Sequence, residues 1–405
     1  MRNPAMTNSS LSNRLETLLG EPLASIRERQ NHTLERLIGG LEQPFALFGA
    51  SHLGRKTQTV LKQMGFSPCA FIDNNPASWG THIDAVPVMS PAQLAEQYDG
   101  KLPSIICTIW SGHISDRMTD RLAPLRKLGF ERIALFGHLA WRYPEHFLPH
   151  YSLDLPEKAA AEAKDIRRAF ALIDDEASRQ LFVDHVEWRL TLDHDLLPPA
   201  SPLSIYFDAH FSSDCADEVL YDIGAFNGDS VVEYLESGRS YREIHSFEPS
   251  PANFAELSSN LSQLEADQGR KLFAHALAVG DSNGEILIED GSGAASRVGR
   301  GSQQVMITTI DDLACRIAPA SFIKIDIEGF EPQCLAGGRK LISERHPVVA
   351  VCVYHEQNHL WSVLLQLHEY YPHYHFTLCP HLAEGWDLVL YAVPADRLPQ
   401  HSIAE

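Results

Sequence analysis

The feature of the sequence that most restricts the fold is an apolar segment that runs directly into a glycine-rich turn. Residues 219–223 read VLYDI, and Gly224 and Gly228 follow before a helical pattern that starts near Ser230. Glycine lets the backbone turn tightly and approach a ligand closely. The pattern predicts a strand, a turn and a helix that form a nucleotide-type site in an α/β fold.

Carboxylates around this turn indicate which ligand it suits. Asp222 precedes the turn and Asp229 lies directly behind Gly228, where they would repel the pyrophosphate of a dinucleotide. They favour a ligand with an ammonium and a sulfonium group, namely S-adenosylmethionine. Glu248 ends the next apolar segment, 24 residues after Gly224, near the offset at which an acid binds ribose hydroxyls. The alternative to a ligand site is a purely structural one, in which the glycines form a tight turn and an aspartate caps the following helix.

The whole chain reads as two α/β units. We predict a helical cap over residues 1–41, a smaller Rossmann-like domain over 42–150, a helical connector over 151–202 and a longer α/β domain over 203–405. A Gly- and Ser-rich segment, 291–304, is expected to be a loop. The expected strands are FALF, CAFI, SIICTIW and RIALF in the first unit, and VLYDI, EIHSFE, LFAHALAV, ILIED, VMITTI, FIKIDI, VVAVCVY, HFTLC and LVLYAV in the second.

Charge and cysteine content exclude several classes of protein. The net charge is −20, with 33 basic and 53 acidic residues, so nucleic acid is not an expected partner. The seven cysteines form no CxxC pair, which indicates neither a disulfide framework nor a zinc ribbon. Because no apolar run approaches the length of a membrane span or a signal sequence, we expect a cytoplasmic protein without an integral membrane segment.

The second half of the chain resembles the FkbM-type S-adenosylmethionine-dependent methyltransferases over residues 203–394. The resemblance rests on LYDIGAFNGDS, HSFEPSPANFAELSSNL, HALAVGDSNG and FIKIDIEGFEPQCLAGG, in this order. It implies a class I methyltransferase fold, S-adenosylmethionine as cofactor, and O-methylation of a sugar, nucleotide sugar or glycoconjugate precursor. The stretch LCPHLAEGW departs from the Arg-His-Tyr pattern of the family, so the acceptor stays open.

Candidate site residues follow from the turn and from the ends of the fourth and fifth strands. A base near pKa 6.5 suits removal of a hydroxyl proton, which makes His355 the preferred base, and Asp326 is expected at the methyl-transfer centre. Lys324 at the end of the fourth strand is a further catalytic candidate, or it could have a structural role and pair with Glu328. The residues expected to bind cofactor are Asp222, Gly224, Ala225, Asn227, Gly228, Asp229, Glu248 and Asp326, and the catalytic candidates are His355, Asp326, Glu328 and Lys324.

A competing motif overlaps this region. His355, Glu356 and His359 read HExxH, the pattern of zinc hydrolases. In those enzymes the motif is helical, whereas here it follows VVAVCVY, which reads as a strand. Zinc hydrolysis is therefore a remote alternative, no resident metal is expected, and metal binding by His355 and His359 stays open.

The first half carries a weaker turn of the same type. FGASHLGRK places Gly49 and Gly54 at the outer positions of GxGxxG with Ser51 between them, and Asp73 follows at a ribose-binding offset. Residues 44–110 resemble the nucleotide-sugar-binding domain of bacterial sugar acyltransferases, which implies a nucleotide site or a docking role. The possible nucleotide-binding residues are Gly49, Ser51, His52, Gly54 and Asp73. A non-catalytic sugar-nucleotide-binding or scaffold protein is the second functional hypothesis, and the oligomeric state stays open.

Overall fold

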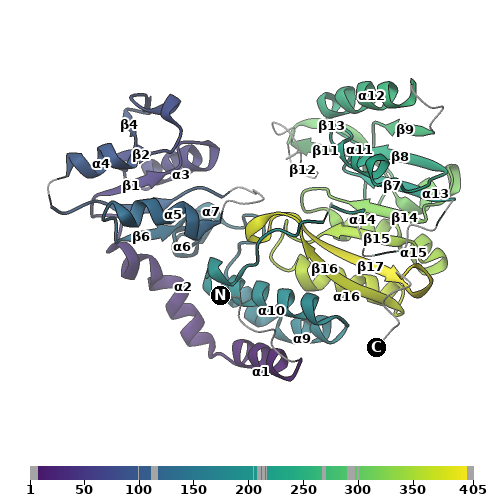
Figure 1. Cartoon of the computed structure of the whole chain (residues 1–405), viewed down its shortest axis with the longest axis horizontal. Helices are drawn as coiled ribbons and strands as arrows, with labels where there is room; N and C mark the ends of the chain where they lie inside the picture. Colours follow the sequence, from purple (N-terminus) through teal and green to yellow (C-terminus); the bar gives the residue numbers. More distant parts are fainter. Residues whose placement is uncertain are drawn as a thin grey trace. The chain divides into compact units, whose positions relative to one another are not determined.

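The computed structural model describes residues 8–98, 100–110, 117–203, 205–207, 211, 215, 217–266, 271–289, 297–298 and 301–398. The chain divides into two units (Figure 1). Unit 1 takes in the chain up to Ala163 together with Val183–Ala200 and Leu382–Trp386, and unit 2 takes in Lys164–Phe182, Ser201–His381 and the chain from Asp387 on. The residues expected to form a helical connector are thus divided between the two units. Most of the expected loop 291–304 lies outside the described residues, but Arg297–Val298 and the start of Gln303–Thr308 are strands, so the loop prediction is wrong there.

Unit 1 begins with two helices where the sequence predicts a helical cap. Gly39 ends the second of them in the left-handed conformation, with φ +77°. The elements of unit 1 are α1 (Asn8–Leu19), α2 (Leu23–Ile38), β1 (Phe45–Phe48), α3 (His52–Gln63), β2 (Ala70–Ile72), β3 (His82–Ile83), β4 (Val86–Met89), α4 (Pro91–Gln97), β5 (Ser104–Cys107), α5 (Met118–Lys127), β6 (Ile133–Leu135), α6 (Phe136–Arg142), α7 (Pro144–Phe147) and α8 (Pro156–Ala161), with 3₁₀ turns at Pro76–Ser78, His194–Leu196 and Ala383–Gly385.

The sheet of unit 1 has the order β3-β4-β2-β1-β5-β6, and all of its pairings are parallel except that of the edge strand β3. Side chains alternate across β1: Phe45 and Leu47 enter one apolar core, and Ala46 and Phe48 enter the other. Burial on both faces explains the continuous apolar strands. The sequence missed the two-residue edge strand β3 and its neighbour β4. The VPVM segment of β4 contains a proline, and β4 lies next to the edge of the sheet.

Unit 2 contains every strand expected in the second half, with one of them interrupted. LFAHALAV forms two short strands in different sheets rather than one. Helix α10 (Glu176–Thr191) has residues in both units. The other elements are α9 (Ala163–Ala171), β7 (Val219–Ile223), α11 (Asp229–Glu236), β8 (Glu243–Phe247), α12 (Pro251–Ala266), β9 (Leu272–His275), β10 (Ala278–Val279), β11 (Gly284–Glu289), β12 (Arg297–Val298), β13 (Gln303–Thr308), α13 (Ile310–Arg316), β14 (Phe322–Ile325), α14 (Glu331–Gly337), α15 (Arg339–Arg345), β15 (Val348–Cys352), α16 (His359–Tyr370), β16 (Tyr374–Pro380) and β17 (Leu388–Pro394), with a 3₁₀ turn at Ala395–Arg397.

The main sheet of unit 2 has the order β16-β17-β15-β14-β7-β8-β9. Strands β9, β8, β7, β14 and β15 are parallel, and β17 runs antiparallel to β15 and to β16. The chain order reverses between β7 and β14, and open α/β sheets bind their ligands beyond the carboxyl ends of the strands at such a switch point. A smaller sheet, β10-β13-β11-β12, accompanies the main one.

A membrane span finds no support in the described part of the chain. None of its helices combines the length and the apolar character needed to cross a bilayer.

Candidate functional site

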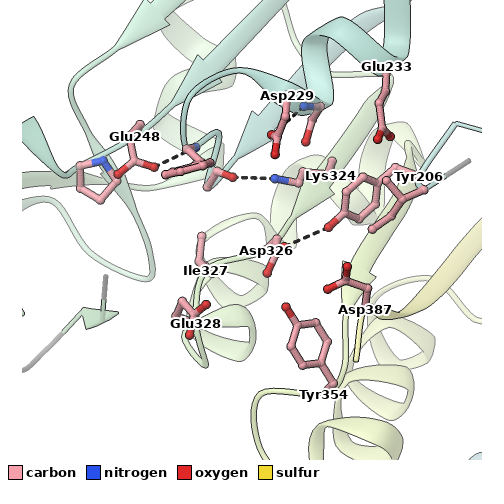
Figure 2. A pocket seen from close by; sticks show the side chains of 15 residues that line it. Tyr206, Asp229, Glu233, Glu248, Lys324, Asp326, Ile327, Glu328, Tyr354 and Asp387 are labelled. Carbon is pink, nitrogen blue, oxygen red and sulfur yellow. Dashed lines mark hydrogen bonds between the residues drawn. The ribbon is translucent and has the colours of Figure 1, made fainter. Parts of the chain in front are cut away.

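A cavity of about 320 Å³ opens at the switch point of unit 2, beyond the ends of β7 and β14 (Figure 2). Six carboxylates and a lysine belong to its lining among the described residues. Figure 2 shows the side chains of Asp229 and Glu233 on one side of this space and those of Asp326, Tyr354 and Asp387 on the other. The lining residues are Ile205, Tyr206, Gly224, Phe226, Asp229, Ser230, Glu233, Glu248, Pro249, Lys324, Asp326, Ile327, Glu328, Tyr354 and Asp387.

The glycine turn forms one wall of the cavity because its backbone passes close to the end of β14. Gly224 has φ +81°, and a Cβ atom there would lie 1.8 Å from the carbonyl oxygen of Asp326. Gly228 has φ +92° and precedes the first residue of α11. Asp229 opens this helix, where a carboxylate is favoured by the helix dipole. Gly224 and Asp229, both predicted to bind cofactor, thus lie in the lining of the cavity.

Glu248 holds the turn in place. Its Oε2 accepts a hydrogen bond from the backbone N–H of Phe226 at 3.0 Å, and its Oε1 accepts one from the N–H of Ser250 at 2.9 Å. Burial raises the pKa of this carboxyl group, and these two donors oppose the rise. An ionised carboxylate has about four acceptor positions, so it can still accept from a ligand in the cavity.

Asp222, predicted to bind cofactor, is not part of the cavity lining. It is fully buried, and its Oδ1 lies 3.0 Å from Nζ of Lys324. Lys324 also donates to the carbonyl oxygen of Gly224 at 2.6 Å. Burial opposes the charged ammonium, but Asp222 and Asp326 outweigh this and raise the pKa of Lys324. For Lys324 the sequence left open a structural pairing with Glu328. The structure pairs it with Asp222, and this pair ties β14 to the glycine turn.

The other predicted cofactor residues divide between the cavity and its surroundings. Ala225 is fully buried, and Asn227 and Gly228 line a separate depression beside α11 and α12. Asp326 does line the cavity, and its Oδ2 accepts a hydrogen bond from the hydroxyl of Tyr206 at 3.0 Å. The predicted set is therefore brought together in part: Gly224, Asp229, Glu248, Asp326, Glu328 and Lys324 share one cavity.

His355 is not placed to act as the predicted base. Its ring is fully buried and does not line the cavity. Burial lowers the pKa of His355, but Glu331, Asp326 and Glu328 outweigh this effect and raise it to about 10. At neutral pH the imidazole without a metal is already protonated, so it cannot accept the proton of a hydroxyl group.

The HExxH motif is not helical, as the preceding strand pattern predicts. His355 lies in the loop after β15, and α16 begins only at His359. The Nδ1 atoms of both histidines face the fully buried carboxylate of Glu331, at 2.8 Å from His355 and 3.2 Å from His359. The two rings thus converge on a carboxylate, which is not the paired-ligand geometry of a helical zinc hydrolase.

Five polar residues of the cavity were not among the predicted site residues: Tyr206, Ser230, Glu233, Tyr354 and Asp387. Asp387 had a usable signal, because it directly precedes the antiparallel strand β17. The start of such a strand lies at the same edge as the ends of the parallel strands. Tyr206 lies outside any helix or strand, and no local pattern indicated it.

Unit 1 repeats the acid-and-turn arrangement at its own switch point, between β1 and β5. Oδ2 of Asp73 accepts from the N–H of Ala50 at 2.8 Å, as Glu248 does from Phe226 in unit 2. A Cβ on Gly54 would lie 1.9 Å from the carbonyl oxygen of Gly49, so the two glycines permit close packing of α3 on the turn. Ser51 and His52 are exposed beside it.

These features define the class of the protein: a Rossmann-like methyltransferase fold whose cavity lies at the switch point of the sheet. Residues 222–377 match the family model described as the methyltransferase FkbM domain, and the chain therefore carries a domain of that family, as the sequence motifs predict. S-adenosylmethionine is the cofactor that goes with this assignment. The comparison with curated proteins found no match.

One solved structure agrees with this fold over almost the whole chain. The chain is similar to a methyltransferase FkbM from Methylobacillus flagellatus KT, with a TM-score of 0.76 and 19% identity, covering 96% of this chain and 100% of that one. At this identity the likeness shows the fold alone, and it extends over both units. The chain also matches in part an rRNA methylase from Streptococcus thermophilus. This match has a TM-score of 0.28 and 12% identity, and it covers 44% of this chain and 88% of that one.

Proposed function

We propose that this protein is an S-adenosylmethionine-dependent O-methyltransferase that acts on a hydroxyl group of a sugar, nucleotide sugar or glycoconjugate precursor. The observation that carries the proposal is the acidic cavity at the switch point, in a domain of a methyltransferase family. The carboxylates suit the ammonium and sulfonium groups of the cofactor. Glu248 binds the ribose hydroxyls, and Gly224 lets the cofactor lie against the turn.

Methyl transfer to an alcohol is an in-line displacement, so the cavity has to align the acceptor oxygen with the methyl carbon and remove a proton. We assign alignment to Asp326, which the hydroxyl of Tyr206 holds in place. Both oxygens of Asp326 have neighbours, since Oδ1 lies 3.4 Å from Nε2 of His355. We therefore assign the proton to the carboxylate of Asp387 on the same wall.

The first test is calorimetric titration of the purified full chain with S-adenosylmethionine. We expect Glu248→Ala to weaken binding roughly 10- to 100-fold, because a hydrogen bond to a charged group contributes about 1.5–3 kcal/mol. Asp73→Ala is the matched control, since Asp73 holds the equivalent turn in unit 1. Equal affinity for wild type and Glu248→Ala would remove Glu248 from the cofactor site. Absence of binding to the wild type would favour the non-catalytic hypothesis.

Cofactor affinity should also depend on pH. Burial, with Asp229 and Glu236, raises the pKa of Glu233 to about 7, and burial with Asp326 raises that of Asp387 to about 6. Both groups lose their charge as the pH falls from 8 to 5, and a cationic ligand is then held less strongly. We expect affinity to decrease roughly 20- to 30-fold over this range, because two lost charges at about 1 kcal/mol each amount to about 2 kcal/mol. Titrations with a chelator present should give this profile for the wild type and a flatter one for Glu233→Gln. A profile that rises towards acid pH would contradict the assignment.

For unit 1 we propose a nucleotide-binding role that serves the same chemistry, with the nucleotide part of a sugar donor or acceptor on the turn of Gly49, Ser51, His52 and Gly54 beside Asp73. The Asp73 contact to Ala50 supports it because it matches the turn geometry of unit 2. Titration with nucleoside diphosphate sugars should show binding that Asp73→Ala weakens and Glu248→Ala leaves unchanged. The reverse pattern would assign such binding to unit 2.

A further inference from the structure

The loop after β2 in unit 1 holds an exposed tryptophan beside Asp73. Trp79 is 36% exposed, and it belongs to neither of the two apolar cores that the described residues of unit 1 form. A buried tryptophan removes a large apolar area from water, so a position that leaves the ring exposed gives up much of this contribution to stability. The packing of unit 1 therefore does not explain an indole at this position.

The indole is nevertheless held in one place. Its Nε1–H group donates a hydrogen bond to the carbonyl oxygen of Asp73 at 2.8 Å. The backbone is fixed on both sides of the ring, because the N–H of Trp79 donates to the carbonyl oxygen of Pro76 at 3.2 Å and the N–H of Gly80 donates to that of Val88 at 2.9 Å. A side chain that is ordered before a ligand arrives loses less entropy on binding. Trp79 thus provides a fixed aromatic surface next to Asp73.

Asp73 is the residue of unit 1 that is placed to hold a ribose. Its Oδ2 accepts from the N–H of Ala50 at 2.8 Å, and its Oδ1 accepts from the N–H of Asn75 at 2.8 Å. Since an ionised carboxylate has about four acceptor positions, positions remain for ribose hydroxyls. The base of a nucleotide is attached to the ribose carbon next to the one that carries the 2′-hydroxyl. A ribose bound at Asp73 therefore brings its base close to this residue, to whose backbone the indole is bonded.

We propose that Trp79 stacks on the base of a nucleotide whose ribose is bound by Asp73. The proposal rests on the nucleotide-binding role proposed for unit 1 and adds the residue that recognises the base. Every nucleobase has a π-face, so stacking on an aromatic side chain accepts different bases. It favours a nucleoside diphosphate and its sugar derivatives over a sugar phosphate that has no base.

The test is calorimetric titration of the full chain with the diphosphates of uridine, adenosine and guanosine, and with ribose 5-phosphate as the probe without a base. We expect the wild type to bind at least one of the three diphosphates. Trp79→Ala should weaken this binding about 5- to 150-fold, which is the range for stacking of one base on an aromatic side chain. The same variant should not change the affinity for ribose 5-phosphate. Asp73→Ala should weaken the binding of the same diphosphate, which assigns it to unit 1.

Two further variants separate stacking from other effects of the substitution. Trp79→Phe keeps an aromatic ring but cannot donate to the carbonyl oxygen of Asp73, and we expect its affinity to stay within about fivefold of the wild type. Leu128→Ala is the matched control, because Leu128 is an apolar side chain of unit 1 with a similar exposed fraction, 39%, outside this loop. It should bind the diphosphates as the wild type does.

Trp79→Phe that binds as weakly as Trp79→Ala would overturn the proposal, since the hydrogen bond to Asp73 and not the ring would then be what matters. Binding that Asp73→Ala weakens and Trp79→Ala leaves unchanged would refute stacking alone and keep the proposed role of unit 1. If none of the three diphosphates binds to the wild type, that role is refuted and the inference with it.

Discussion

Replacement of Gly224 by alanine is expected to abolish the binding of S-adenosylmethionine. The new Cβ would lie 1.8 Å from the carbonyl oxygen of Asp326. The Cβ is fixed to the backbone of the glycine turn, and the oxygen belongs to the backbone after β14. Neither can move away without shifting the turn after β7 or the end of β14. Calorimetry should show a loss of more than about 100-fold in affinity, beyond the roughly 1 kcal/mol that a positive φ costs alanine by itself.

Gly228→Ala provides the matched control. Gly228 also has a positive φ, at +92°, but its Cβ would meet a methyl group of Leu257 at 3.1 Å, and that side chain can adjust. Both variants therefore share the conformational cost, and only Gly224→Ala adds the clash with the backbone. Similar affinities for the two variants would show that close approach at Gly224 is not what shapes the site.

The glycine turn could be predicted from sequence because its signal is local. A strand, a glycine and a helix within a dozen residues define the turn, and Glu248 follows at the distance that a strand–helix–strand unit requires. The strands were predictable for the same reason, since burial on both faces makes them apolar throughout. The order of the strands then brings Gly224, Glu248 and Asp326 to one edge of the sheet.

The rest of the site depends on contacts that no local pattern contains. Asp222 and His355 lie within the motifs of the sequence, but their side chains point into the protein, towards Lys324 and Glu331. Sequence gives the position of a residue on a strand and not the partner that neutralises it. The partner here decides the role, because a histidine surrounded by carboxylates holds its proton and no longer acts as a base.

The pair of Asp222 and Lys324 gives the second large prediction. We expect Lys324→Met to destabilise unit 2 by about 3–5 kcal/mol, because it leaves the carboxylate of Asp222 buried without its cation. The chain has two units, so a global unfolding curve would mix their stabilities. Hydrogen–deuterium exchange of peptides that contain β7 and β14 measures unit 2 directly.

The pH dependence of this effect distinguishes a structural lysine from the catalytic one that the sequence suggested. Burial already raises the pKa of Asp222 from 3.8, and loss of Lys324 removes the charge that opposes this rise. A carboxyl group with a raised pKa destabilises the fold when it must ionise, so the deficit of Lys324→Met should be large at pH 8 and shrink towards pH 4. Asp222→Asn combined with Lys324→Met removes both charges and should recover much of the loss at pH 8. If Lys324→Met instead keeps the stability of the wild type and lowers only turnover, the lysine acts in the chemistry and the ion pair contributes little to the fold.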